Sequence, residues 1–132
     1  MSDKRAVPLT ILASASRTDT TTQDYVNDQF KGGDFIVDQT VQGSTIAFVS
    51  VKLQGRIPGT TAYWTVGTIS PATTATFRRR LKVYPGATTA IDSTGLVATV
   101  TVNDFLPAVW RIATTNVSTS AVTYSISANL YA

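Results

Sequence analysis

Few residues in this chain of 132 are of the types that perform catalysis. The chain contains no cysteine and no histidine, and all eight of its acidic residues are aspartates. The common nucleophilic triads and thiolate sites are therefore excluded, and so are the usual ligands of transition metals. A hydrolase would need two carboxylates that face each other across a cleft. Asp34 and Asp38 are the candidates, because their even spacing puts them on one face of a strand. We favour a second interpretation, in which they are strand-end charges that keep a sheet edge soluble.

Metal and cofactor sites have little support in the sequence. Asp24 and Asp28 could bind Ca²⁺, but the alternating oxygen ligands of an EF-hand loop are missing. No glycine-rich phosphate-binding loop occurs either. We therefore expect no catalytic residues, no metal site and no cofactor, and the sequence predicts a protein that is not an enzyme.

The densest charged feature is Arg78-Arg79-Arg80 followed by Lys82. In a strand, Arg78, Arg80 and Lys82 share one face, which must meet water or an anionic partner. Three interpretations are open: a solvated face, a contact with an acidic patch on another subunit, or binding to a nucleic-acid backbone. We rank nucleic acid last, because the net charge is only +3 and no broader basic stripe accompanies the cluster. Together with two cations of the N-terminal tail, these side chains form the predicted partner interface: Lys4, Arg5, Arg78, Arg80 and Lys82.

Aromatic side chains offer one alternative function. Tyr63-Trp64 could form a stacking platform for sugars or bases. We expect instead that Trp64 lies in the core and Tyr63 at the surface. A carbohydrate-binding module that uses Tyr63, Trp64 or Tyr131 nevertheless stays open.

The composition predicts a globular, all-β domain. Hydrophobic residues make up 43% of the chain and charged residues 14%, which is typical of a folded protein. The absence of glutamate and the abundance of threonine, about one residue in six, favour turns and pleated strands over helices. No apolar stretch reaches the length that spans a membrane, so we expect no membrane contact.

Short apolar runs separated by turn signals predict about eight strands. Arg17–Asp28 is polar and is predicted as a solvated loop, whereas the near-continuous apolar run in Thr45–Leu53 predicts a strand buried on both faces. We predict a single-domain antiparallel β-sandwich, jelly-roll-like, over residues 8–132, preceded by a flexible arm of residues 1–7. The predicted strands are Pro8–Ser14, Asp34–Asp38, Thr45–Leu53, Ala62–Ile69, Phe77–Tyr84, Leu96–Val102, Val109–Ala113 and Val122–Tyr131.

The segment Val102–Arg111 is predicted to be a corner that builds the core. Asn103-Asp104 can bend the chain through side-chain hydrogen bonds. Pro107 cannot sit in a central strand ladder, and it pushes Leu106 into extended geometry. Trp110 should be the largest buried side chain of the strand that follows.

Several segments together resemble a family of small virion proteins of tailed bacteriophages. They are spread over most of the chain, and none of them is a catalytic motif: Leu12–Thr18, Val51–Gly55, Leu81–Gly86, Asn103–Pro107 with Trp110-Arg111, and Thr123–Ile126. The triple arginine departs from the family pattern. Members of this family occur among head and tail structural proteins, so the resemblance implies a non-enzymatic structural protein of the virion.

The small size and the β-rich character extend this expectation to a capsid decoration protein at the capsid surface. Such a protein would bind and stabilise the lattice of the major capsid protein. We expect a homo-oligomer, with a trimer at capsid threefold positions favoured. A head–tail connector or a tail component is the alternative within the virion.

Overall fold

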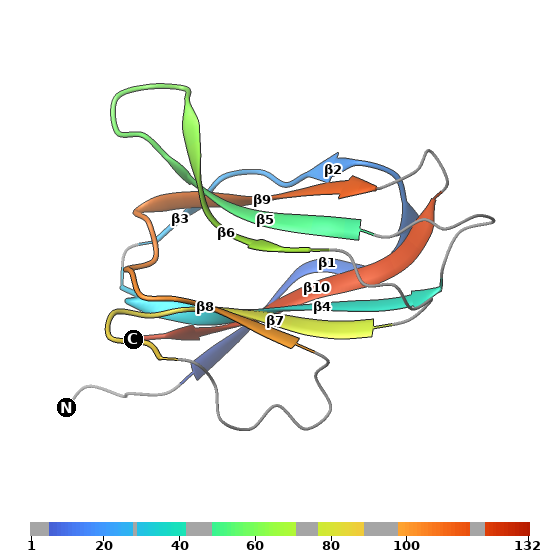
Figure 1. Cartoon of the computed structure of the whole chain (residues 1–132). Coiled ribbons are helices and arrows are strands. Elements are labelled where there is room, and N and C mark those ends of the chain that lie inside the picture. The colour runs from blue at the N-terminus through green and yellow to red at the C-terminus, as the bar shows by residue number, and fades with distance from the viewer. Residues whose placement is uncertain (1–5, 28, 42–48, 71–76, 89–97, 117–120) are drawn as a thin grey trace.

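A computed structural model of the chain describes residues 6–27, 29–41, 49–70, 77–88, 98–116 and 121–132 (Figure 1). These residues form strands and no helix, which confirms the all-β prediction and leaves no helix there that could cross a membrane. The strands are β1 (Ala6–Arg17), β2 (Thr20–Thr21), β3 (Tyr25–Val26), β4 (Gly32–Val41), β5 (Val49–Arg56), β6 (Tyr63–Ile69), β7 (Phe77–Val83), β8 (Ala98–Val102), β9 (Val109–Asn116) and β10 (Val122–Tyr131).

Each of the eight predicted strands is present, and β2 and β3 are additional. Both of these two-residue strands lie within the segment predicted as a solvated loop, and both pair with β9. That part of the loop prediction is therefore wrong. Residues 1–5 of the predicted arm lie outside the described residues, while Ala6 and Val7 belong to β1, where they pair with Tyr131 and Leu130.

The strands form two layers, seen as the lower and upper sheets of Figure 1. The lower sheet has the order β1-β10-β4-β7-β8 and the upper one β2-β9-β5-β6, with β3 also on β9. We call them sheet A and sheet B. The order corresponds to a jelly roll when β2 and β3 count as one interrupted strand and β8 is set aside. The jelly-roll-like sandwich of the sequence prediction is thus present.

The strand order follows from a nested pairing, in which strands from the start of the chain pair with strands from its end and the strands between them pair inside these. The first strand pairs with the last, β2 with β9, β4 with β7 and β5 with β6, all antiparallel. The chain is therefore one long hairpin that is rolled into two layers, with the β5–β6 turn at its tip. Strand β8 is an addition to this scheme, because it lies parallel to β7 at the edge of sheet A.

The core lies between the two sheets and is built by strict alternation. In β10, Val122, Tyr124, Ile126, Ala128 and Leu130 are buried, while the residues between them are half-buried or exposed. Strand β5 alternates in the same way, so the prediction of burial on both faces is wrong for its described residues 49–53. Residues 45–48 of that prediction lie outside the described residues. The described strands form only two layers, so none of them covers the outer face of β5.

Trp110 anchors the core as predicted, with 2% of its surface exposed. Tyr25 stacks on its indole at 4.4 Å between ring centroids, and Phe35 meets it edge-on at 5.3 Å. The corner before it differs in detail from the prediction. The side-chain oxygen of Asn103 accepts a hydrogen bond from the distant amide of Gly86 (2.6 Å), so it ties two loops together. Asp104 Oδ1 forms a local bond of the predicted kind, because it accepts from the amide of Phe105 at 2.7 Å.

Candidate interaction surfaces

The predicted basic interface lies partly on the outer face of β7. Arg78 and Lys82 are opposite Asp38 and Asp34 of β4 in the strand register, and Arg80 is opposite Ile36. Arg78 Nε is 3.3 Å from Asp38 Oδ2, so one of the three cations already has an anionic partner within the sheet. Lys4 and Arg5 lie outside the described residues. The interface itself stays a prediction, and of its described cations Arg78 has an ion-pair partner in the neighbouring strand.

Asp34 and Asp38 share one strand face, as their spacing predicts. Their strand β4 lies between β10 and β7, so the interpretation as charges that protect a sheet edge is wrong. Asp34 is buried, with 6% of its surface exposed, and it accepts a short hydrogen bond from the Tyr131 hydroxyl on its Oδ2. Each carboxylate thus contacts its own partner, Tyr131 or Arg78. This is not the facing pair that general acid–base hydrolysis requires.

Burial raises the pKa of Tyr131 to about 12, with a further contribution from the hydrogen bond to Asp34. The phenol is therefore a stable donor at neutral pH and holds the buried carboxylate. Tyr84 packs edge-on against Tyr131 at 6.1 Å between centroids. Asp34 Oδ1 is buried and has no hydrogen-bond partner among the described residues, which makes the bond from Tyr131 more important for the stability of this site.

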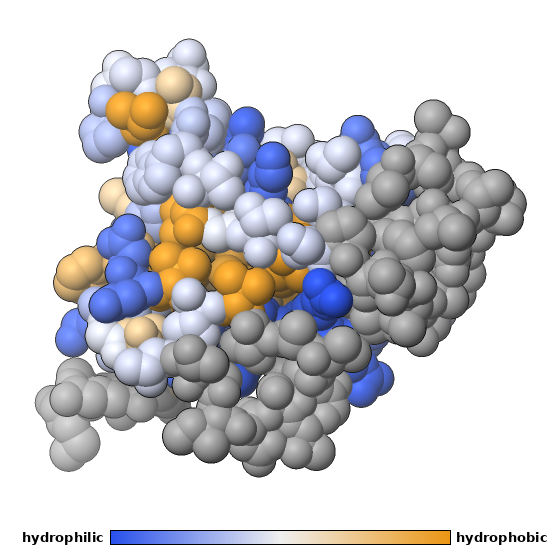
Figure 2. Space-filling view, viewed as in Figure 1, coloured by the Kyte–Doolittle hydropathy of each residue, from blue (hydrophilic) through white to orange (hydrophobic). Residues whose placement is uncertain are grey.

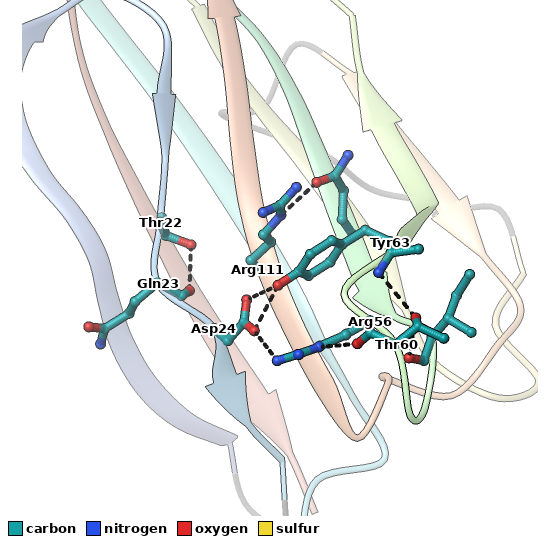
Figure 3. A network of polar contacts seen from close by, with 10 residues as sticks. Thr22, Gln23, Asp24, Arg56, Thr60, Tyr63 and Arg111 are labelled. Atoms are coloured by element: carbon teal, nitrogen blue, oxygen red, sulfur yellow. Dashed lines mark hydrogen bonds and ion pairs between the residues drawn. The ribbon is translucent and has the colours of Figure 1, made fainter.

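A second polar cluster lies on the outer face of sheet B and is shown in Figure 3. We call it the Asp24 network. Asp24 lies between β2 and β3, and its carboxylate oxygens Oδ1 and Oδ2 accept hydrogen bonds from the Tyr63 hydroxyl at 2.7 and 2.8 Å. It also forms an ion pair with Arg56 Nη1 at 3.2 Å. Arg111 lies 3.5 Å over the Tyr63 ring centroid and donates from Nε to Gln54 Oε1 at 2.9 Å. The network joins β5, β6, β9 and the β2–β3 segment.

The Asp24 network holds the base of the β5–β6 hairpin, which projects from the sandwich at the upper left of Figure 1. Pro58 and Gly59 form the turn, in which the amide of Thr60 donates to the Ile57 carbonyl at 3.1 Å and Gly59 has φ of +75°. This geometry is a type II turn. Arg56 Nε donates to the Thr60 carbonyl at 2.7 Å, so the side chain that reaches Asp24 also contacts the turn.

Trp64 is not in the core. It is 40% exposed and packs over Gly55, where an added Cβ would come within 2.5 Å of the indole. The prediction for Trp64 is wrong because Trp64 lies at the hairpin end of β6, where the β5–β6 hairpin projects beyond the sandwich, whereas Ile69 at the other end of the strand is buried. Tyr63 is half-buried, and one face of its ring is occupied by Arg111.

Two hollows lie at the hairpin end of the sandwich. The larger, of about 720 Å³, is lined by Arg56, the turn residues 57–61, Ala108 and Val109. The smaller, of about 340 Å³, is lined by Asn27, Gln29, Phe30, Lys31, Phe105, Leu106 and Ala108. Figure 2 shows apolar side chains on the projecting hairpin. Among the described residues, no group of three or more His, Cys, Asp or Glu is arranged to hold a metal ion.

Sequence reasoning missed the Asp24 network and the hollows. The Pro58-Gly59 turn could have indicated that Arg56 and Tyr63 lie opposite each other, because hairpin register follows from the turn. No local sequence pattern indicates that Asp24 or Arg111 contacts these residues, because both lie far from the hairpin in the sequence. Comparison with known proteins adds no relative: no family model, no curated protein and no solved structure matches the chain significantly.

Proposed function

We propose that this protein is a non-enzymatic structural protein of a bacteriophage virion that decorates the capsid and stabilises the lattice of the major capsid protein. The observation that carries the proposal is the jelly-roll strand order of the two sheets. Viral capsid domains and lectins commonly have this architecture. The argument is an analogy at the level of the fold, and it agrees with the virion role that the sequence analysis expects.

The form of the molecule fits a protein that works by packing on neighbours. Its carboxylates Asp24, Asp34 and Asp38 each contact a tyrosine or an arginine. Its β5–β6 hairpin is a preorganised protrusion, and preorganised contact segments lose little conformational entropy on binding. We propose a homo-oligomer, with a trimer favoured, that contacts the capsid through the N-terminal residues and the outer face of β7.

The abundance of the chain in purified native particles, relative to the major shell protein, tests the proposal. A ratio near parity, measured by quantitative mass spectrometry, is expected for a protein that coats the lattice. A ratio far below parity would place it in a head–tail connector or tail ring instead. Absence from the particles would overturn the virion role altogether.

Two variants test the proposed contact surface. We expect that replacing Arg78, Arg80 and Lys82 by glutamine reduces incorporation into particles, and that removing residues 1–5 does so as well. The deletion stops before Ala6 because β1 begins there. Lys52→Gln is the matched control, since Lys52 is an exposed cation on the outer face of sheet B. Unchanged incorporation of both variants would show that the capsid is bound through another surface.

A carbohydrate-binding module is the second candidate, because Trp64 is exposed and lectins also use jelly rolls. Tyr63 fits it less well, since Arg111 covers one face of its ring. Titration of tryptophan fluorescence with varied glycans separates the two functions. Trp110 is buried, so quenching would report on Trp64. A flat titration across the glycans removes this candidate.

A further inference from the structure

The two hollows at the hairpin end are adjacent. Ala108 lines both of them, so the larger hollow beneath the hairpin turn meets the smaller one beside Phe105 at this residue. Their volumes, about 720 and 340 Å³, fall within the range of about 300–1,000 Å³ that is usual for binding pockets. Two adjacent hollows suit an extended segment better than one compact ligand. We call this surface the hairpin groove.

The larger hollow of the hairpin groove has a mainly apolar lining, whereas the smaller one combines apolar side chains with Asn27, Gln29 and Lys31. Ile57 is 41% exposed and Phe105 is 61% exposed. Val26, the residue opposite Val109 in the strand register, is 79% exposed and extends the apolar surface along β3. Large exposed apolar side chains that gather at one end of a protein indicate a contact site. Apolar side chains of a partner would therefore be buried here.

Among the described residues, the charged side chains that line the groove are two cations. Arg56 lines the larger hollow and Lys31 the smaller one, and among the described lining residues no carboxylate accompanies them. Asp24 binds Arg56 from the network behind the hairpin and does not line either hollow. A partner that carries carboxylates would complement Lys31, and Arg56, although it is paired with Asp24, retains 39% side-chain exposure for a further contact.

We propose that the hairpin groove docks an extended segment of another protein, in which apolar side chains are flanked by carboxylates. The identity of that protein rests on the proposed function, which makes it a component of the virion. A nucleic acid fits less well, because tight binding to a phosphate backbone requires more than two cations. The Asp24 network keeps the hairpin in place before the partner arrives, so the groove is preformed.

The first experiment uses particles that lack this chain and the purified full-length protein. We expect Ile57→Asp and Lys31→Glu each to weaken binding to these particles at least tenfold. Lys52→Glu is the matched control, since Lys52 is also an exposed lysine but lies outside both hollows, and it should bind like the wild type. Thermal unfolding checks that all three variants are folded. If wild type binds and every variant binds equally well, the groove assignment is wrong while the virion role stands.

The second experiment is independent of the virion. Amide NMR shifts of the full chain are followed during titration with a peptide Asp-Leu-Val-Leu-Asp and, separately, with Lys-Leu-Val-Leu-Lys and an oligothymidylate. Shifts confined to residues 57–61, Lys31, Ala108 and Val109 with the acidic peptide alone support the proposal, even if binding to particles fails. No shift at these residues, or a larger shift with the basic peptide or the oligonucleotide, overturns it.

Discussion

Two tyrosine hydroxyl groups of this protein form hydrogen bonds with buried polar side chains. The Tyr124 hydroxyl of β10 meets Thr114 Oγ1 of β9 at 2.8 Å in the buried core and so joins sheet A to sheet B. The Tyr131 hydroxyl binds the buried carboxylate of Asp34 on the outer side of sheet A. A buried polar group that loses its partner costs about 1–3 kcal/mol. Each of these two tyrosines therefore stabilises the fold through its hydrogen bond as well as through the burial of its ring.

Tyr124→Phe should lower the free energy of unfolding by about 1 kcal/mol, because the ring still fills the core and only the hydrogen bond to Thr114 is lost. Thr114 Oγ1 keeps its bond to the Thr20 carbonyl at 3.2 Å, which limits the cost. Urea denaturation measures the change. A value near zero would mean that the bond between the sheets has no net effect.

Tyr131 should make stability fall with rising pH above about 10. Its folded-state pKa, about 12, lies above the ordinary value of 10.0, so the unfolded chain releases the proton first. The stabilising contribution is complete below pH 10 and is lost as the pH rises through 12. Urea denaturation of wild type and Tyr131→Phe between pH 8 and 12 checks this. The gap between the two proteins should shrink over this window, and a constant gap would contradict the linkage.

Among the elements, the β5–β6 hairpin is held by contacts at both its turn and its base. The turn is closed by the Thr60–Ile57 bond and the base by the Asp24 network. Side-chain hydrogen bonds also hold strand β1 at the register shifts beside Leu12. Arg17 donates there to the carbonyls of Ala13 and Tyr124 and covers the Tyr124 ring. Bulges at sheet edges are often stabilised in this way because they leave backbone groups unpaired.

Asp24→Ala should loosen the hairpin without unfolding the sandwich. Amide hydrogen exchange at Ile57, Thr60 and Ala62 is expected to become faster, while global stability falls by no more than about 1 kcal/mol because the ion pair is partly exposed. Asp19→Ala is the control, since Asp19 binds the amide of Asn116 at 2.7 Å far from the hairpin. Equal exchange at the hairpin in both variants would show that the network does not hold it.

Gly59→Ala should destabilise the turn by about 1 kcal/mol, the usual cost of a left-handed backbone for a residue with a side chain. An added Cβ would meet nothing within 4 Å, so the effect comes from the φ of +75° alone. Thermal unfolding measures the loss. An unchanged melting temperature would mean that the turn adopts another type in the variant.

At the scale of the whole molecule, the nested pairing makes the two chain halves depend on each other. Strand β10 lies between β1 and β4 and contributes five buried residues to the core. Its partners come from the first third of the chain, so the sheets close only after distant segments meet. Such topologies fold slowly, over milliseconds to seconds, because the loop entropy is lost before the contacts form.

Removal of residues 122–132 should abolish folding, because sheet A then loses the strand that joins β1 to β4. Removal of residues 1–5 should leave the strand pairing intact, since β1 begins at Ala6. Far-ultraviolet circular dichroism and cooperative thermal unfolding distinguish the two results. A cooperative transition in the chain without β10 would contradict the nested scheme.

The all-β class, the position of the eight main strands and the central role of Trp110 could be predicted from the amino-acid sequence, because alternation and turn residues act locally. The sequence also indicated which charged residues share a face, as for Arg78 and Lys82. It could not determine the strand order, since hydrophobic patterns specify buried faces and not neighbours. The exposure of Trp64, the internal position of β4 and the Asp24 network follow from that order. Only the tertiary structure decided them, because they depend on contacts between residues far apart in the chain.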